Sequence, residues 1–291
     1  MKQLGRVALA TLVVTVLVAL TGCASLLDRA ANNFADDLEA AIRAYDEPTV
    51  VSAGLPAFLL LMEARLQSRP NDVGLRLTTA RLTGTYATLF ADQNAQEREQ
   101  RLTRRALDHA RIGACQHSRS LCELDRLDFE ALEDRIDTLG PGQVEAVYVL
   151  ATSWTTWIAA HAQDFRALAD LPRVESLLTW VAATEPGYDD GAVYLYLAVL
   201  NSQRPPAAGG QPRKARDYFE RARASSQGRN QLVNVMMADS YARLLFDRDL
   251  YVELLETVLQ SDNDHPDYRL VNQVARSRAL ILLEQTEELF D

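Results

Sequence analysis

Apolar residues recur at every third or fourth position along almost the whole chain, a period that is typical of amphipathic α-helices. Almost no segment alternates between apolar and polar residues in the manner of a β-strand. The first helical run after the amino-terminal segment has its apolar positions at Leu27, Ala30, Phe34, Leu38, Ala41 and Tyr45. We therefore expect an all-α protein whose first helix begins soon after residue 23.

Polar turns divide the predicted helices into antiparallel pairs. Pro56 opens a helix that ends at the polar segment 68–72, and the next helix extends to Phe90, because proline is tolerated in a first turn and a short polar segment reverses the chain. The same arrangement returns in residues 172–200, 215–244 and 250–289. The turns near residues 186, 228 and 265 are about 40 residues apart, which is the spacing of helical-hairpin repeats.

One predicted helix carries a repeat signature. Ala215, Phe219 and Ala222 have the Ala-x-x-x-Phe-x-x-Ala spacing of the second helix of a tetratricopeptide unit, in which small residues let neighbouring helices approach and the aromatic ring fills the gap. The predicted fold is therefore all-α, with tetratricopeptide-like helical hairpins stacked in one domain that covers residues 23–291.

The first 22 residues have the organisation of a secretory signal. Lys2 and Arg6 precede an uncharged apolar run at residues 7–20, which is shorter than the roughly 20 residues that a spanning helix needs. The run leads into Leu-Thr-Gly-Cys, which resembles a lipobox, the signal for acylation of its cysteine. We expect residues 1–22 to be a lipoprotein signal peptide and Cys23 to carry lipid. A plain cleaved signal with an incidental cysteine is the alternative.

The residues after Cys23 bear on which membrane holds the protein. Ala24 and Ser25 follow it, and the aspartate that resembles an inner-membrane retention mark in lipoproteins is missing. We therefore expect the protein to face the periplasm, on the outer membrane rather than the inner one. Several acyl chains hold a protein on a bilayer far longer than a single chain does.

The charge of the processed chain argues against one class of partner. Removal of residues 1–22 leaves 28 basic and 40 acidic residues, a net charge of −12. The arginines are scattered among acidic residues and form no basic stripe. Because phosphate recognition needs clustered basic side chains, we do not expect nucleic acid as a partner.

Two further cysteines, Cys115 and Cys122, are seven residues apart. An even pair in an oxidising compartment indicates a disulfide, which here would staple a turn between two helices. The alternative, a metal site, needs more ligands than His117 adds. We expect neither a metal nor another cofactor.

The chain lacks the common catalytic motifs: the His-Glu-x-x-His and Gly-x-Ser-x-Gly patterns, the phosphate-binding loop and the dinucleotide fingerprint. His161 and Asp164 are three residues apart and can face each other on one helix. Such a pair is far more often a solvated or capping contact than an acid–base couple. We therefore do not expect an enzyme.

Bulky aromatic residues gather near the middle of the chain. They are Trp154, Trp157, Trp180, Tyr194 and Tyr196. Such residues can line a cleft for an apolar or flat ligand. The alternative is packing between helices, because helical hairpins need bulky core residues in any case.

Three parts of the chain resemble the T component of TRAP transporters, the tripartite ATP-independent periplasmic carriers. They are residues 53–63 followed by Arg69-Pro70-Asn71 and Tyr86, residues 209–222 continuing to Tyr241, and residues 254–290. The resemblance covers nearly the whole processed chain, although residues 115–122 match no pattern of this family.

The resemblance, to a family of lipoproteins often written TatT, implies an all-helical protein that trimerises around a central opening and binds the solute-binding P component. It also implies that hydrophobic or organic-acid ligands pass along a cleft, and it brings no catalytic residues. Two other functions stay open. One is a tetratricopeptide scaffold lipoprotein of outer-membrane assembly that binds extended peptide tails, and the other is a lipoprotein enzyme of the cell wall.

Overall fold

The computed structural model describes the chain apart from residues 1–37, 39, 91–95, 203–209 and 263. The predicted signal peptide, Cys23 and most of the helix expected from Leu27 lie outside the described residues. All regular elements in the described part are helices, which confirms the all-α prediction.

The chain order of these elements is simple. The longer helices are α2 (Pro48–Ser68), α3 (Val73–Phe90), α4 (Gln96–His117), α5 (Phe129–Asp137), α6 (Val144–Ala160), α8 (Leu171–Thr184), α9 (Ala192–Asn201), α10 (Pro212–Ser225), α12 (Arg248–Gln260) and α13 (Arg269–Glu284). The short ones are η1 (Arg119–Leu121), η2 (Leu124–Arg126), η3 (Pro141–Gln143), α7 (Phe165–Leu168), η4 (Tyr188–Gly191), α11 (Leu232–Met236), η6 (Met237–Ala242) and α14 (Thr286–Phe290).

The predicted pairs of helices are present. The turn at residues 69–72 separates α2 from α3, and the backbone N–H of Leu75 donates to the Asp72 side chain at 3.1 Å, which anchors the start of α3. The pairs α8 and α9, α10 and α11, and α12 and α13 also fall at the predicted positions. Phe219 of α10 is fully buried, and its ring centroid lies 6.3 Å from that of Tyr241 on η6.

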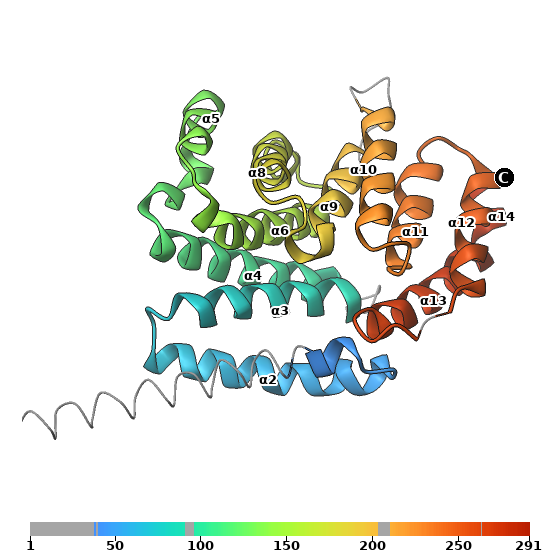
Figure 1. The fold of residues 1–291 in the computed structure, drawn as a ribbon, viewed down its shortest axis with the longest axis horizontal. Helices are drawn as coiled ribbons and strands as arrows, with labels where there is room; N and C mark the ends of the chain where they lie inside the picture. The colour runs from blue at the N-terminus through green and yellow to red at the C-terminus, as the bar shows by residue number, and fades with distance from the viewer. Residues whose placement is uncertain (1–37, 39, 91–95, 203–209, 263) are drawn as a thin grey trace, which may run out of the picture.

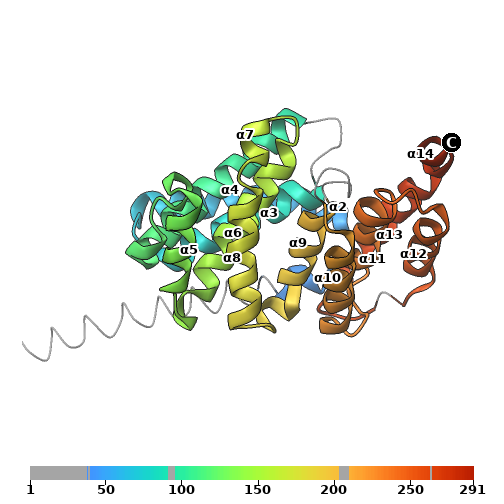
Figure 2. The same cartoon turned by 90° about the horizontal axis from the view of Figure 1, so that it is seen from above.

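The helices follow a curved path that brings the start of α13 to the segment before α2. Figure 1 shows α2 and α3 along one side and α10 to α14 at one end, with α13 returning towards α2. The view from above shows α6, α8 and α9 between α5 and α10 (Figure 2). Arg269, the first residue of α13, donates to the carbonyl of Ala44 at 3.1 Å. Residues 225 positions apart therefore meet.

The helix that was predicted to begin at Pro56 begins eight residues earlier, so this boundary prediction is wrong. Glu47 caps α2, because its side chain accepts from the backbone N–H of Thr49 at 3.3 Å. Pro56 lies inside the helix, where its ring removes the hydrogen bond to the carbonyl of Ser52. Ser52 is only partly buried, so solvent can reach this side of the helix.

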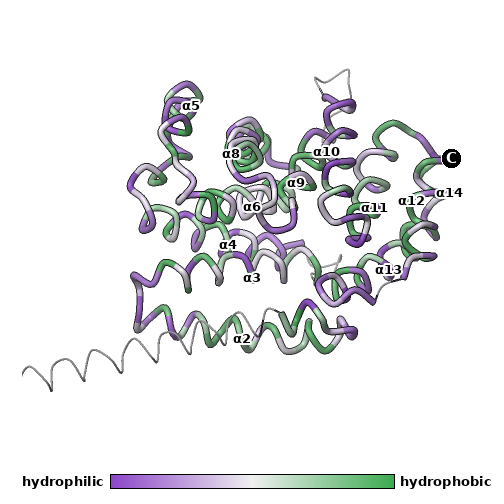
Figure 3. Tube along the Cα trace, in the orientation of Figure 1, coloured by the Kyte–Doolittle hydropathy of each residue, from purple (hydrophilic) through white to green (hydrophobic). Residues whose placement is uncertain are grey.

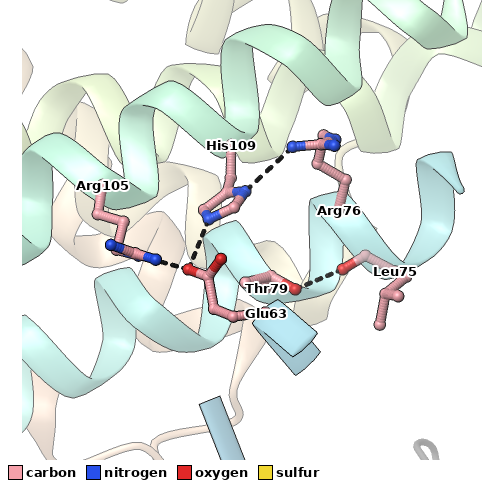
Figure 4. A network of polar contacts seen from close by, with 6 residues as sticks. All are labelled: Glu63, Leu75, Arg76, Thr79, Arg105 and His109. Atoms are coloured by element: carbon pink, nitrogen blue, oxygen red, sulfur yellow. Dashed lines mark hydrogen bonds and ion pairs between the residues drawn. The ribbon is translucent and has the colours of Figure 1, made fainter. Parts of the chain in front are cut away.

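A polar network fastens α2 to α3 and α4 (Figure 4). Glu63 accepts from Arg105 and contacts His109 Nε2 at 2.9 Å, while Arg76 lies 3.4 Å from His109 Nδ1. Since Arg76 can only donate, Nδ1 must accept and Nε2 carries the proton towards Glu63. Burial opposes the charged form of Glu63, but the hydrogen bonds from Arg105 and His109 outweigh it and lower its pKa.

The approach of α3 to α4 depends on a glycine. A Cβ atom at Gly113 would lie 2.8 Å from Cδ2 of Leu77, which is closer than packed carbon atoms come. Cys115, in the last turn of α4, and Cys122, directly after η1, form a disulfide with their Cα atoms 4.3 Å apart. The bond ties the last turn of α4 to the residue that follows η1, and it therefore staples the turn between these two helices as predicted.

Candidate functional site

A cavity of about 300 Å³ lies where α3, α6, η4, α9, α11 and α13 converge. We call it the central cavity. Its walls are mainly apolar, with Leu82, Leu195 and Leu270 among the lining residues, and its charged lining residues are Arg43, Arg81, Asp189, Asp190 and Asp267. Ligand pockets typically combine such apolar walls with a few polar groups.

Two helices present small and hydroxyl-bearing residues to the central cavity at helical spacing. From α3 these are Gly84, Thr85 and Thr88, and from α6 they are Thr152 and Thr156. Three of the hydroxyls donate within their own helix: Thr88 to Gly84 at 2.9 Å, Thr152 to Tyr148 at 2.8 Å and Thr156 to Ser153 at 3.0 Å. Their donor capacity is thus used, and the wall offers methyl groups and acceptor oxygens.

One edge of the central cavity has an unusual backbone. Asp189, Asp190 and Gly191 have φ angles of 49°, 54° and 72°, a left-handed conformation that costs about 1–3 kcal/mol for a residue with a side chain. A Cβ atom at Gly191 would lie 2.4 Å from Oγ of Ser225. Glycine is required at this position, and the surrounding contacts must hold the two aspartates in place.

The two aspartates connect distant parts of the chain. Asp189 accepts from the hydroxyl of Tyr148 on α6 at 2.8 Å and from Arg43 at 3.3 Å. Asp190 accepts from the hydroxyl of Tyr268 at 3.0 Å. The segment before α2, the middle of the chain and the start of α13 therefore meet at one edge of the cavity.

The tyrosines around the central cavity are held in the protonated form. Burial, reinforced by Asp189, raises the pKa of Tyr148 well above its ordinary value and the pKa of Tyr196 to about 12. Burial together with the hydrogen bond to Asp190 raises the pKa of Tyr268 to about 12. At neutral pH these groups are hydrogen-bond donors, and none can serve as a base.

The structure separates the five aromatic residues that the sequence suggested for a cleft. Tyr196 lines the central cavity, and its ring centroid lies 6.3 Å from that of Tyr148. Tyr194 is buried and its ring stacks with Tyr218 at a centroid distance of 6.3 Å. Trp180 is partly buried against the core.

The other two tryptophans pack against arginines. Trp154 is 1 % exposed, its indole N–H donates to Asp170 at 3.2 Å, and the guanidinium of Arg111 lies 5.3 Å from its ring centroid. Trp154 lines a second, more open hollow beside the disulfide. Trp157 lies 4.9 Å below the guanidinium of Arg104. Of the five aromatics, Tyr196 alone is among the residues that line the central cavity.

His161 and Asp164 make separate local contacts. The Asp164 side chain accepts from the backbone N–H of Arg166 at 2.9 Å and caps α7, and this bond lowers its pKa. His161 Nδ1 contacts the carbonyl of Trp157 at 2.8 Å. This capping role matches the interpretation made from the sequence. Among the described residues, no cluster of three or more His, Cys, Asp or Glu side chains is placed to hold a metal ion.

Sequence reasoning missed most of the residues that give the central cavity its polar character: Arg43, Arg81, Tyr148, Asp189 and Tyr268. One local signal was present. Asp189-Asp190-Gly191 combines residues that tolerate the left-handed conformation. Nothing local indicates that Arg43 and Tyr268 would lie beside it.

Comparison with known protein families decides the assignment. A family model described as the TRAP transporter T-component matches residues 44–290, which is most of the chain. The chain belongs to the TRAP transporter T-component family. No curated protein matches this T-component. The T-component is a membrane-associated part of a transport system, and its family is not a family of enzymes.

Proposed function

We propose that this T-component is a lipoprotein, held through Cys23 on the periplasmic side of the outer membrane, that binds the solute-binding P component of its transporter. We further propose that it assembles as a homotrimer and holds a hydrophobic or organic-acid ligand. Membership of the T-component family supports the association with the transporter, and the central cavity supports the holding of a ligand, because it joins apolar walls to a few fixed polar groups.

The lining of the central cavity favours a small molecule with an apolar body and one acidic group. Leucine side chains and threonine methyl groups suit the apolar body. Arg81 on α3 brings positive charge to the wall, close enough to oppose the rise in the pKa of Tyr148. Both oxygens of Asp189 already accept hydrogen bonds, so this carboxylate needs no cation from the ligand.

The decisive experiment is calorimetric titration of the lipid-free T-component with the solute-binding protein encoded beside it, with and without candidate organic acids. We expect a dissociation constant on the order of micromolar, since ligand exchange requires a partner that leaves. No binding at roughly 100 μM in either state, with binding of outer-membrane peptide tails instead, would favour the scaffold function.

Two matched arginine variants test the ligand site. Arg81→Gln should weaken binding of the organic acid at least about tenfold, because a charge-assisted contact is worth roughly 1.5–3 kcal/mol. Arg104→Gln removes an equal charge beside Trp157, away from the cavity, and should leave ligand affinity unchanged. Equal losses in the two variants would contradict the placement of the ligand in the central cavity.

A further inference from the structure

Helix α2 has an outward side that is apolar from Val50 to Ala64. Its members are exposed and recur at helical spacing: Val50, Ala53, Gly54, Ala57, Leu60, Leu61 and Ala64. We call this set the outer face of α2. Leu60 and Leu61 are 70 % and 66 % exposed, and Val50 is 51 % exposed. No side chain of the outer face is charged or can form a hydrogen bond.

The composition of α2 sets it apart from the other described helices. Among them, it is the one long and apolar enough to cross a membrane by length and composition. A buried core helix passes the same test, but only five of the 21 residues of α2 are buried. Figure 1 places α2 at the edge of the molecule, with α3 on one side. Half of an apolar helix therefore faces outwards.

Charged residues avoid the middle of this helix. Asp46 and Glu47 lie at its start, Arg65 and Arg69 lie at its end, and the tube in Figure 3 shows polar colour mainly at these ends. The one acidic residue inside α2, Glu63, turns inwards to Arg105 and His109. The outer face is thus an uncharged strip on a protein with a processed net charge of −12.

We infer that the outer face of α2 rests on the lipid surface to which the chain is anchored, an inference that relies on the proposed acylation of Cys23. Pro48 follows Cys23 by only 25 positions, and a chain of that length reaches at most about 90 Å when fully extended. The anchor therefore keeps α2 close to the membrane surface, within the reach of this short segment. An uncharged face lets an acidic body approach anionic headgroups with less repulsion than an acidic face would meet.

A lipid surface fits the outer face of α2 better than a protein partner does. Energetically dominant residues of protein interfaces are enriched in Trp, Tyr and Arg, and the outer face contains none of these. Four of its seven members are Ala or Gly, so the outer face is flat. Leu60 and Leu61 are the side chains that would reach furthest into the lipid. Such a surface binds weakly by itself. The acyl anchor makes weak contact sufficient by keeping the local concentration high.

The test uses the acylated protein in vesicles of phosphatidylethanolamine and phosphatidylglycerol. Cysteine is introduced by Leu61→Cys, or by Leu280→Cys as the control, and labelled with a polarity-sensitive fluorophore. The native cysteines do not react, because Cys115 and Cys122 are bonded and Cys23 is acylated. Leu280 is a fair control because it is 50 % exposed on α13.

We expect the label at position 61 to shift to shorter wavelength and to be quenched at least twofold by nitroxide-bearing lipid, while the label at position 280 does neither. Equal behaviour at the two positions would overturn the inference. Mass spectrometry of the amino-terminal peptide reports acylation separately. A protein that lacks the lipid anchor can therefore be distinguished from an anchored protein whose outer face of α2 does not contact the membrane.

Other occupants give different results in the unacylated Cys23→Ser chain. A blue-shifted label at position 61 without vesicles would mean that protein already covers the outer face of α2, and this would overturn the inference. Light scattering of Leu60→Gln/Leu61→Gln then identifies the occupant. A lower molar mass would mean that a second copy covers the face, and an unchanged mass would indicate residues 24–37 of the same chain.

Discussion

The two aromatic regions of this T-component use their rings in opposite ways. Around Trp154 and Trp157, rings and arginines stack on one another, and the exposed fraction of Trp154 is only 1 %. Around the central cavity, Tyr148, Tyr196 and Tyr268 border open space, and two of them donate to aspartates. The tryptophans add buried area, whereas the tyrosines add polar groups at fixed positions.

This difference shows why a count of aromatic residues does not locate a binding site. Tryptophan is the largest side chain, and burying it is favourable wherever helices pack. A buried tyrosine needs a partner for its hydroxyl. At the central cavity that need is met by aspartates in a strained turn, and strain of this kind concentrates at functional sites.

The largest stability effect should come from the tryptophan region. Trp154→Ala removes a fully buried ring and the hydrogen bond to Asp170, so we expect the free energy of unfolding to fall by about 3–5 kcal/mol. Urea denaturation measures this loss. The partly buried Trp180 is the control, and a larger loss from Trp180→Ala would contradict the ranking of the two sites.

A smaller loss is expected at the edge of the central cavity. Gly191→Ala combines a left-handed φ of 72° with a contact of 2.4 Å to Ser225, which should cost about 2–3 kcal/mol. Gly142→Ala serves as the control, because nothing lies within 4 Å of a Cβ atom there. Thermal unfolding of both variants tests the comparison, and similar melting temperatures would argue against a required glycine.

Asp189→Asn should cost about 1–2 kcal/mol, because it weakens one hydrogen bond and removes an ion pair whose partner Arg43 is 40 % exposed. Its more specific effect is local. Hydrogen exchange of residues 40–45 should accelerate, since Arg43 loses a charged partner on the cavity edge. The exposed Asp137 provides a matched Asn variant, and faster exchange there as well would indicate a general loss of stability.

The smallest effect concerns alkaline pH. The pKa of Tyr268 is raised to about 12 by burial and the bond to Asp190. Its contribution to stability is therefore complete below pH 10, the ordinary pKa, and is lost as the pH rises towards 12. Chemical denaturation gives the free energy of unfolding at pH 9 and at pH 11, and this free energy should fall between the two pH values. The fall should be smaller in Tyr268→Phe than in the unmodified protein, and the difference should be less than about 1 kcal/mol. An equal fall in the free energy of unfolding of both proteins would contradict the assignment of this pH dependence to Tyr268.

Much of the fold follows from local sequence. The helical period and the turns at Arg69-Pro70-Asn71 and Ser225 to Gly228 predict helices and reversals that the structure contains. The start of α2 was missed because Pro56 usually marks a first turn, and the capping contact of Glu47 decides the boundary instead. Nothing in the residue pattern predicts the π-helical turn of η6.

The central cavity was less accessible to sequence reasoning. Arg43 and Asp189 are 146 residues apart, and Asp190 and Tyr268 are 78 residues apart. Their encounters depend on the curvature of the whole helical array, which small differences in packing between helices determine. The sequence suggested Tyr196 as one of five aromatic residues that could line a cleft. That carboxylates lie near it becomes evident only in three dimensions.

The most direct test is to ask which aromatic region holds the ligand of the purified T-component. Leu195→Trp fills the central cavity, whereas Trp154→Phe trims the packed region and leaves the cavity wall intact. Small molecules extracted from the unmodified protein and both variants can be quantified by mass spectrometry. The ligand should be lost from Leu195→Trp and retained by Trp154→Phe. Retention in Leu195→Trp together with loss from Trp154→Phe would contradict the account.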